Sequence, residues 1–173
     1  MPRIATVIAL AALFLGSCAV STSHDRQADM EAITKAVHTS IEWAVPDKDF
    51  ESLYSVLAQD DRLFVFHPNA AGTVIGFPAF KEMTEGLFMN PDFKATGSDI
   101  RDLRIDISEG GDVAWYSCLL DDYGEFKGQP YAWKNARWTG VLEKRDGAWR
   151  IVQMHFSFAS DAKDDDSSEE SEG

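Results

Sequence analysis

The stretch DGAWRIVQMHFSF, residues 146–158, decides the fold. Asp146-Gly147 is a typical turn dipeptide between strands, and the residues that follow are rich in aromatic and β-branched side chains. We therefore expect a closing strand that is entered through a tight hairpin. Regular alternation would place His155 and Ser157 on one face and Phe156 on the other. Both faces are largely apolar, so the pattern leaves open which of them looks into the interior.

Three further strand patterns precede this one. Residues 103–107 alternate apolar and charged side chains, residues 113–121 are apolar on both faces, and residues 131–144 return after a loop at 124–130. The Gly110-Gly111 turn joins the first two of these strands. The second half of the chain thus predicts a sheet of four antiparallel strands joined by hairpins.

The first half of the chain is mostly helical. Apolar residues recur every three or four positions over residues 26–44, a second helix follows the acids at 47–49, and a third starts with Pro78. Short strands are expected at 63–66 and 74–75. Helices packed on one side of an antiparallel sheet make an α+β fold.

Two of the strands, at 113–120 and 149–158, are apolar on both faces. Three helices can cover only one face of the sheet, so the other face needs a different partner. We therefore expect a homodimer that forms through the outer face of the sheet.

The N-terminus is typical of an export signal. Arg3 precedes an apolar run at residues 4–14, which is too short to span a bilayer. The sequence Leu15-Gly16-Ser17-Cys18 resembles the lipobox of bacterial lipoproteins. We expect removal of residues 1–17, lipidation of Cys18, a tether at 18–25 and anchoring to a membrane of the bacterial cell envelope. Ordinary signal cleavage after Ala19 is the alternative.

Charge and cysteine content exclude several classes of function. The net charge is −13. Residues 161–173 contain seven acids and one lysine, which predicts an acidic disordered tail after a domain at 26–160. Clustered Lys and Arg are lacking, which argues against nucleic acid as a partner. Cys18 and Cys118 are the only cysteines, so a disulfide framework is excluded, and Cys118 is expected to be an inert core thiol.

Four features together suggest a family. They are a Trp-bearing first helix, Asp60-Asp61 before the strand at 63–66, the run Gly111-Asp112-Val113-Ala114-Trp115, and the sequence EKRDGAWRIV at 143–152. In these features the chain resembles the SnoaL-like branch of the nuclear transport factor and ketosteroid isomerase-like superfamily. The resemblance implies a curved, cone-shaped sheet around three N-terminal helices, with a pocket inside it and a dimer across the outer face. Members include isomerases, dehydratases, cyclases and hydrolases as well as non-catalytic modules.

The candidate bases for such a pocket are His67, His155 and Asp122. A histidine titrates near neutral pH, and in the isomerases of the family a desolvated carboxylate is the base. His67 could instead anchor a loop, and His155 could bond to a neighbouring strand. Asp60 and Asp61 are at most supporting residues.

Further side chains could bind a ligand or donate a hydrogen bond to it. Tyrosines are candidate donors, and a buried Arg137 could bind a carboxylate, although pairing with an acid on a neighbouring strand is the alternative. The candidates are Trp43, Tyr54, Tyr116, Tyr131, Arg137 and Ser157. No metal-ligand spacing or cofactor motif occurs, so neither is expected. The main hypothesis is a pocket for a small, partly apolar molecule, and the alternatives are an acid–base enzyme and an assembly module.

Overall fold

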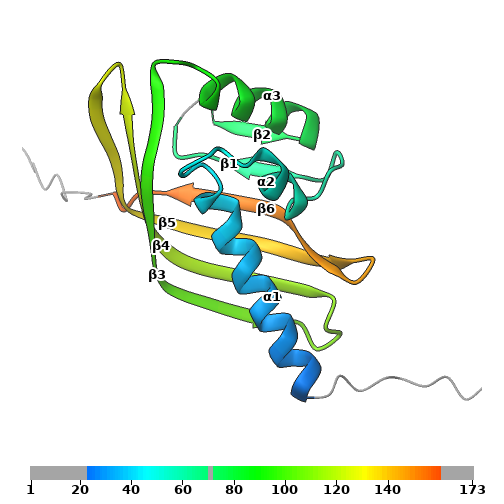
Figure 1. Ribbon diagram of the computed structural model, residues 1–173. Helices are drawn as coiled ribbons and strands as arrows, with labels where there is room; N and C mark the ends of the chain where they lie inside the picture. Colours follow the sequence, from blue (N-terminus) through cyan, green and yellow to red (C-terminus); the bar gives the residue numbers. More distant parts are fainter. Residues whose placement is uncertain (1–22, 70–71, 161–173) are drawn as a thin grey trace, which may run out of the picture.

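The computed structural model describes residues 23–69 and 72–160 (Figure 1). The predicted signal peptide, Cys18 and the acidic tail at 161–173 lie outside the described residues. Within the described residues, two helices are followed by two short strands, a third helix and then four long strands. The α+β class expected from the sequence is confirmed.

The three helices are α1 (Ser23–Glu42), α2 (Phe50–Ser55) and α3 (Phe77–Phe88). The tether expected at 18–25 lies mostly outside the described residues, and α1 begins at Ser23. Asp49 caps α2 by accepting the backbone N–H of Ser52 at 3.0 Å. Pro78 lies in the first turn of α3, where its missing N–H costs no hydrogen bond.

The six strands form one curved sheet in the order β2-β1-β6-β5-β4-β3. Their bounds are β1 (Phe64–Phe66), β2 (Thr73–Ile75), β3 (Phe93–Ile107), β4 (Val113–Phe126), β5 (Gln129–Arg145) and β6 (Ala148–Ser157). The four long strands pair antiparallel, as expected. The strand expected at 103–107 is much longer, since β3 already starts at Phe93. The loop expected at 124–130 was wrong, because the β4–β5 hairpin continues to a turn at Lys127 and Gly128.

The helix α1 lies along the concave face of the sheet (Figure 1). Ile33 and Val37 on this helix are fully buried, as is Trp138 on β5. Near the start of α1, Asp29 accepts hydrogen bonds from Lys144 Nζ at 2.6 Å and from the Trp149 indole Nε1 at 2.9 Å. The helix is therefore fixed to β5 and β6 by one buried carboxylate.

A β-bulge in β6 changes which residues of this strand face inward. Val141 pairs with Gln153 and Leu142 pairs with Ile151, so Val152 is an extra residue on β6. Before the bulge the inward residues include Ile151, and after it they are Met154 and Phe156. The bulge explains why the sequence of this strand is apolar in both alternations.

A second bulge has the same effect on β5. Leu120 pairs with Ala136, but Asp122 pairs with Trp133, so β5 contains one more residue than β4 in this interval. Asn135 takes a positive φ of 52° in the bulge. Trp138 and Ala136 face inward on one side of it, and Trp133 faces inward on the other side.

Candidate functional site

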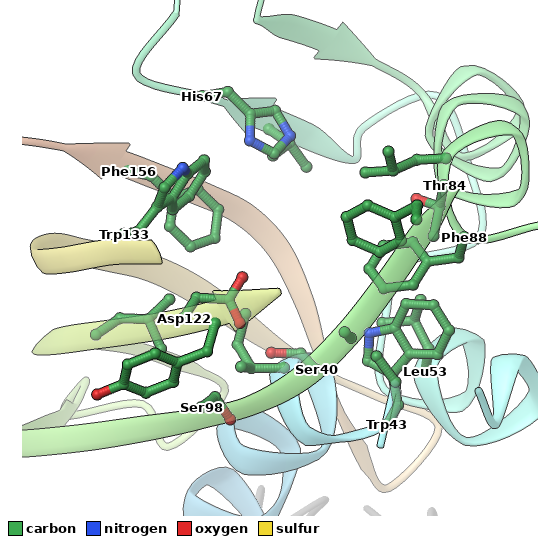
Figure 2. Close-up of a pocket in the computed structure, with 18 of the residues that line it drawn as sticks. Ser40, Trp43, Leu53, His67, Thr84, Phe88, Ser98, Asp122, Trp133 and Phe156 are labelled. Atoms are coloured by element: carbon green, nitrogen blue, oxygen red, sulfur yellow. The ribbon is translucent and has the colours of Figure 1, made fainter. Parts of the chain in front are cut away.

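A cavity of about 540 Å³ lies between the C-terminal end of α1, the helix α3 and the ends of the long strands (Figure 2). This volume lies within the usual range for small-molecule sites. Most of the wall is apolar, and its aromatic side chains come from the helices and from the sheet: Trp43, Phe80, Phe88, Phe93, Trp133 and Phe156. The cavity therefore offers flat apolar surfaces on several sides.

His67 enters the cavity because β1 pairs in parallel with β6. Phe66 lies opposite His155. The next residues of the two strands, His67 and Phe156, therefore both point to the inner face of the sheet. The His67 ring stacks on Phe156 with centroids 5.5 Å apart and planes 11° apart. Its Nε2 is buried and has no hydrogen-bond partner in the described part of the chain. Burial lowers the pKa of His67, so the neutral ring is favoured.

Gly72 keeps the loop after His67 tight. The backbone N–H of His67 donates to the Gly72 carbonyl at 2.9 Å. A Cβ atom at Gly72 would lie only 2.6 Å from the His67 Cβ and 2.5 Å from Asn69 Oδ1. A glycine is therefore needed here for the histidine to reach the cavity.

Asp122 projects into the cavity from β4 (Figure 2). Burial raises the pKa of Asp122 to about 6, and the backbone N–H of Tyr123 opposes this rise only in part. The carboxyl group therefore gains and loses its proton close to neutral pH. The Asp122 carboxyl can therefore donate a hydrogen bond inside the cavity when it is protonated, and it can accept one when it is ionised.

Tyr131 lies across the β4–β5 pair from Gly124 and also lines the cavity. A Cβ atom at Gly124 would fall 2.6 Å from the tyrosine hydroxyl, so the ring covers this glycine. Burial and the nearby Asp122 together raise the pKa of Tyr131 to about 12. Smaller polar groups complete the lining, including Ser40, Thr84 and Ser98 (Figure 2).

The structure thus brings four of the predicted site residues to one cavity: His67, Asp122, Trp43 and Tyr131. His155, Ser157 and Arg137 are not among its lining residues. The bulge at Val152 turns His155 and Ser157 to the outer face, where His155 stacks on Phe66 with centroids 5.3 Å apart. Arg137 is exposed on the same face, opposite Ser157.

The other two predicted tyrosines contact protein groups away from the cavity. The Tyr54 hydroxyl donates to Glu85 at 3.1 Å and so joins α2 to α3. Tyr116 is buried in the core beneath α1, where its ring covers Gly140 and meets Trp138 edge to face. Asp60 accepts a bond from Arg145 at 2.7 Å on the surface.

Sequence reasoning missed several lining residues. Phe88 ends α3 and Phe93 begins β3, and only the packing of the helix against this strand brings the two rings together, at 4.8 Å between ring centroids. Phe156 was assigned to the face opposite His155, but the sequence contains no signal that this is the cavity face. Thr84 and Ser98 are ordinary polar residues without a recognisable motif.

Within 23–69 and 72–160, no group of His, Cys, Asp and Glu side chains has an arrangement that could hold a metal ion. No described helix has both the length and the apolar character needed to cross a membrane. Cys118 is buried, and burial raises the pKa of its thiol to about 12, as expected for an inert core cysteine.

A family model described as a SnoaL-like domain matches residues 32–161. The chain belongs to this SnoaL-like family. The resemblance inferred from the sequence motifs is therefore confirmed. A comparison with curated proteins found no match to this SnoaL-like chain.

Solved structures share the fold of this SnoaL-like domain. A putative scytalone dehydratase from Novosphingobium aromaticivorans is 17% identical with a TM-score of 0.65, covering 78% of this chain and 87% of that one. The hexachlorocyclohexane dehydrochlorinase LinA-type3 from Novosphingobium barchaimii is 20% identical with a TM-score of 0.61, covering 78% and 89%. An NTF2-like protein from Prochlorococcus is 16% identical with a TM-score of 0.58, covering 74% and 91%. At these identities the likeness concerns the fold alone.

Proposed function

We propose that this SnoaL-like domain binds a small, largely apolar molecule in the cavity, and that the molecule presents a hydroxyl, carbonyl or amine group to Asp122 and His67. The observation that carries the proposal is a buried His67 Nε2 without a partner in the described chain, in an aromatic cavity of about 540 Å³. A buried polar atom without a hydrogen bond is costly, and a ligand group that reaches it offsets this cost.

The rim of the cavity supports entry of an apolar ligand. Met83, Leu87, Phe126 and Tyr131 line the cavity and are each more than a third exposed. Exposed apolar side chains at the mouth of a pocket are typical of ligand entrances.

The test is titration with N-phenyl-1-naphthylamine, a neutral dye whose fluorescence rises in apolar surroundings. We expect saturable binding to the wild type and at least about tenfold weaker binding to Leu87→Trp, because the larger ring fills the entrance. Leu87 is 43% exposed, so the helix tolerates the substitution.

The matched control is Met89→Trp. Met89 caps α3, is 68% exposed and does not line the cavity. This variant should bind the dye like the wild type. Equal binding by Leu87→Trp and the wild type would place the dye elsewhere and contradict the proposal.

Acid–base catalysis is the second candidate function. It is favoured by the placement of Asp122 and His67 in one cavity. Burial raises the pKa of the Asp122 carboxyl to about 6, and burial lowers the pKa of the His67 imidazole, so the neutral ring is available as a base. Two structural neighbours are named as a putative scytalone dehydratase and a hexachlorocyclohexane dehydrochlorinase, and both names denote elimination reactions. In an elimination, one of the two groups would accept a carbon-bound proton and the other would assist the leaving group.

We further propose that the domain is exported and anchored through lipid on Cys18. The support is the position of Leu15-Gly16-Ser17-Cys18 directly after the apolar run. In the original bacterial host, Cys18→Ala should move the protein from the membrane fraction to the soluble fraction. Ala19→Ser, which leaves the cysteine in place, is the control. An unchanged membrane location of Cys18→Ala would contradict lipid anchoring.

We also propose a homodimer through the outer face of the sheet. Phe66, Ile75 and Trp115 on this face are 45%, 67% and 47% exposed. The strand pairings align Ile75, Phe64, Gln153, Val141 and Trp115 in one row across five strands. A second copy of the chain would remove the apolar side chains of this row from water.

A further inference from the structure

We propose that Asp121, on the face of the sheet opposite the cavity, is a positioning residue for the ligand site, because it holds the β5 bulge that turns Trp133 and Tyr131 inward. The effect of Asp121 on ligand binding rests on the function proposed above, but the bulge itself can be observed without a ligand.

The bulge determines which β5 side chains line the cavity. The pairing runs from Leu120 with Ala136 to Asp122 with Trp133, two steps on β4 against three on β5. A regular ladder would place Asp122 opposite Lys134 instead. Because a shift of one residue moves every side chain to the other face, the cavity would then receive Lys134 in place of Trp133.

Asp121 binds the backbone of Asn135, a residue that has no partner in the β4–β5 ladder. The N–H of Asn135 donates to Asp121 Oδ1 at 2.7 Å, and Asn135 has the positive φ of the bulged residue. The contact joins a β4 side chain to the β5 backbone at the site of the irregularity. A carboxylate in this place therefore favours the bulged pairing over the regular one.

Side chains from three strands hold the carboxylate in place. Arg101 on β3 donates from Nη2 to Asp121 Oδ1 at 2.8 Å and to Asn135 Oδ1 at 3.0 Å. Lys134 Nζ and the Tyr123 hydroxyl each lie 3.2 Å from Asp121 Oδ2. Lys134 is thus bound on the outer face, away from Asp122. The Asn135 N–H is the main reason why the pKa of Asp121 falls to about 2, so the group is ionised at neutral pH.

Two adjacent aspartates therefore have different surroundings and roles. Asp121 is ionised among cations on the outside, and Asp122 is desolvated on the inside. The outer residue determines that the neighbours of the inner one are an indole and a phenol rather than an ammonium group.

The test compares Asp121→Ala with the control Asp99→Ala. Asp99 also pairs with Arg101, at 3.2 Å, but does not touch the bulge. In a crystal structure of Asp121→Ala we expect the regular pairing, with Asp122 opposite Lys134 and Trp133 outside the cavity. N-phenyl-1-naphthylamine should bind roughly tenfold or more weakly to this variant, whereas Asp99→Ala should resemble the wild type.

Asp121→Asn separates the hydrogen bond from the charge, because its side-chain oxygen can still accept the Asn135 N–H. It should keep the bulge and the dye affinity, and its largest rise in the rate of hydrogen exchange should be at Asn135. If Asp121→Ala does not fold, the exchange rate of the Asn135 amide in Asp121→Asn tests the proposal. A rate equal to that of the same amide in Asp99→Ala overturns it. An unchanged pairing of Asp122 with Trp133 in Asp121→Ala also overturns it. A wild type that binds no dye contradicts the proposed function, while the pairing in the variants still decides the role of Asp121.

Discussion

Asp122→Asn should make the protein more stable than the wild type above pH 6, by about 3 kcal/mol, and should leave its stability unchanged below about pH 4. Burial raises the pKa of Asp122 from 3.8 to about 6 in the folded protein. The folded state therefore holds its proton more tightly than the unfolded state does. As the pH rises from about 4 to 6, the wild type loses stability because the buried carboxyl must ionise, and an amide does not ionise.

Urea unfolding at pH 4 and pH 7.5 measures this difference. Asp121→Asn is the matched control, because it changes the adjacent residue in the same way but should destabilise the protein at neutral pH. The pKa of Asp121 is lowered, so its ionised form stabilises the fold at every pH above about 4. Equal stability of Asp122→Asn and the wild type at pH 7.5 would show that Asp122 is not desolvated.

Trp115→Glu should convert the proposed dimer to a monomer. Trp115 lies on the outer face of β4, is 47% exposed and pairs with Val141 and Asp106 on its neighbours. In a symmetric interface the new carboxylate would be buried twice, at a cost of about 3 kcal/mol or more, which raises the dissociation constant at least roughly a hundredfold.

Light scattering at micromolar concentration gives the mass directly. The wild type and the control Met89→Glu, on the exposed end of α3, should have twice the mass of the chain, and Trp115→Glu should have the mass of a single chain. A monomeric wild type would reject the dimer, and a dimeric Trp115→Glu would place the interface elsewhere.

Much of the fold could be predicted from local patterns. The helical periodicity of α1, the turn at Asp146-Gly147 and the apolar strands around it all have the structures expected of them. The pairing of β1 with β6 could not be predicted, because it joins residues about 90 positions apart and depends on the curvature of the whole sheet. This pairing is what brings His67 into the cavity.

The direction of the β5 and β6 side chains could not be predicted for a different reason. A period of two along a strand assumes regular pairing, and one extra residue reverses it at a position that the hydrophobic pattern does not reveal. Val152 on β6 and Asn135 on β5 lie in bulges that each contain one such extra residue. They explain why Tyr131 lines the cavity and Arg137 does not, although regular alternation would place both on one face.

Asp122 was accessible to sequence reasoning because β4 remains regular up to this residue. Its alternation with Tyr116, Cys118 and Leu120 places it on the inward face, as the structure shows. Its raised pKa was not accessible, because burial depends on α3 and on aromatic residues from other strands.

The most direct test of the proposed binding site is a crystal structure of the protein with N-phenyl-1-naphthylamine. We expect the dye inside the cavity, with its rings against Trp133 and Phe156 and its amine within hydrogen-bond distance of Asp122. Dye bound at another surface, or a cavity without dye in crystals saturated with it, would contradict the proposal that this cavity is the ligand site.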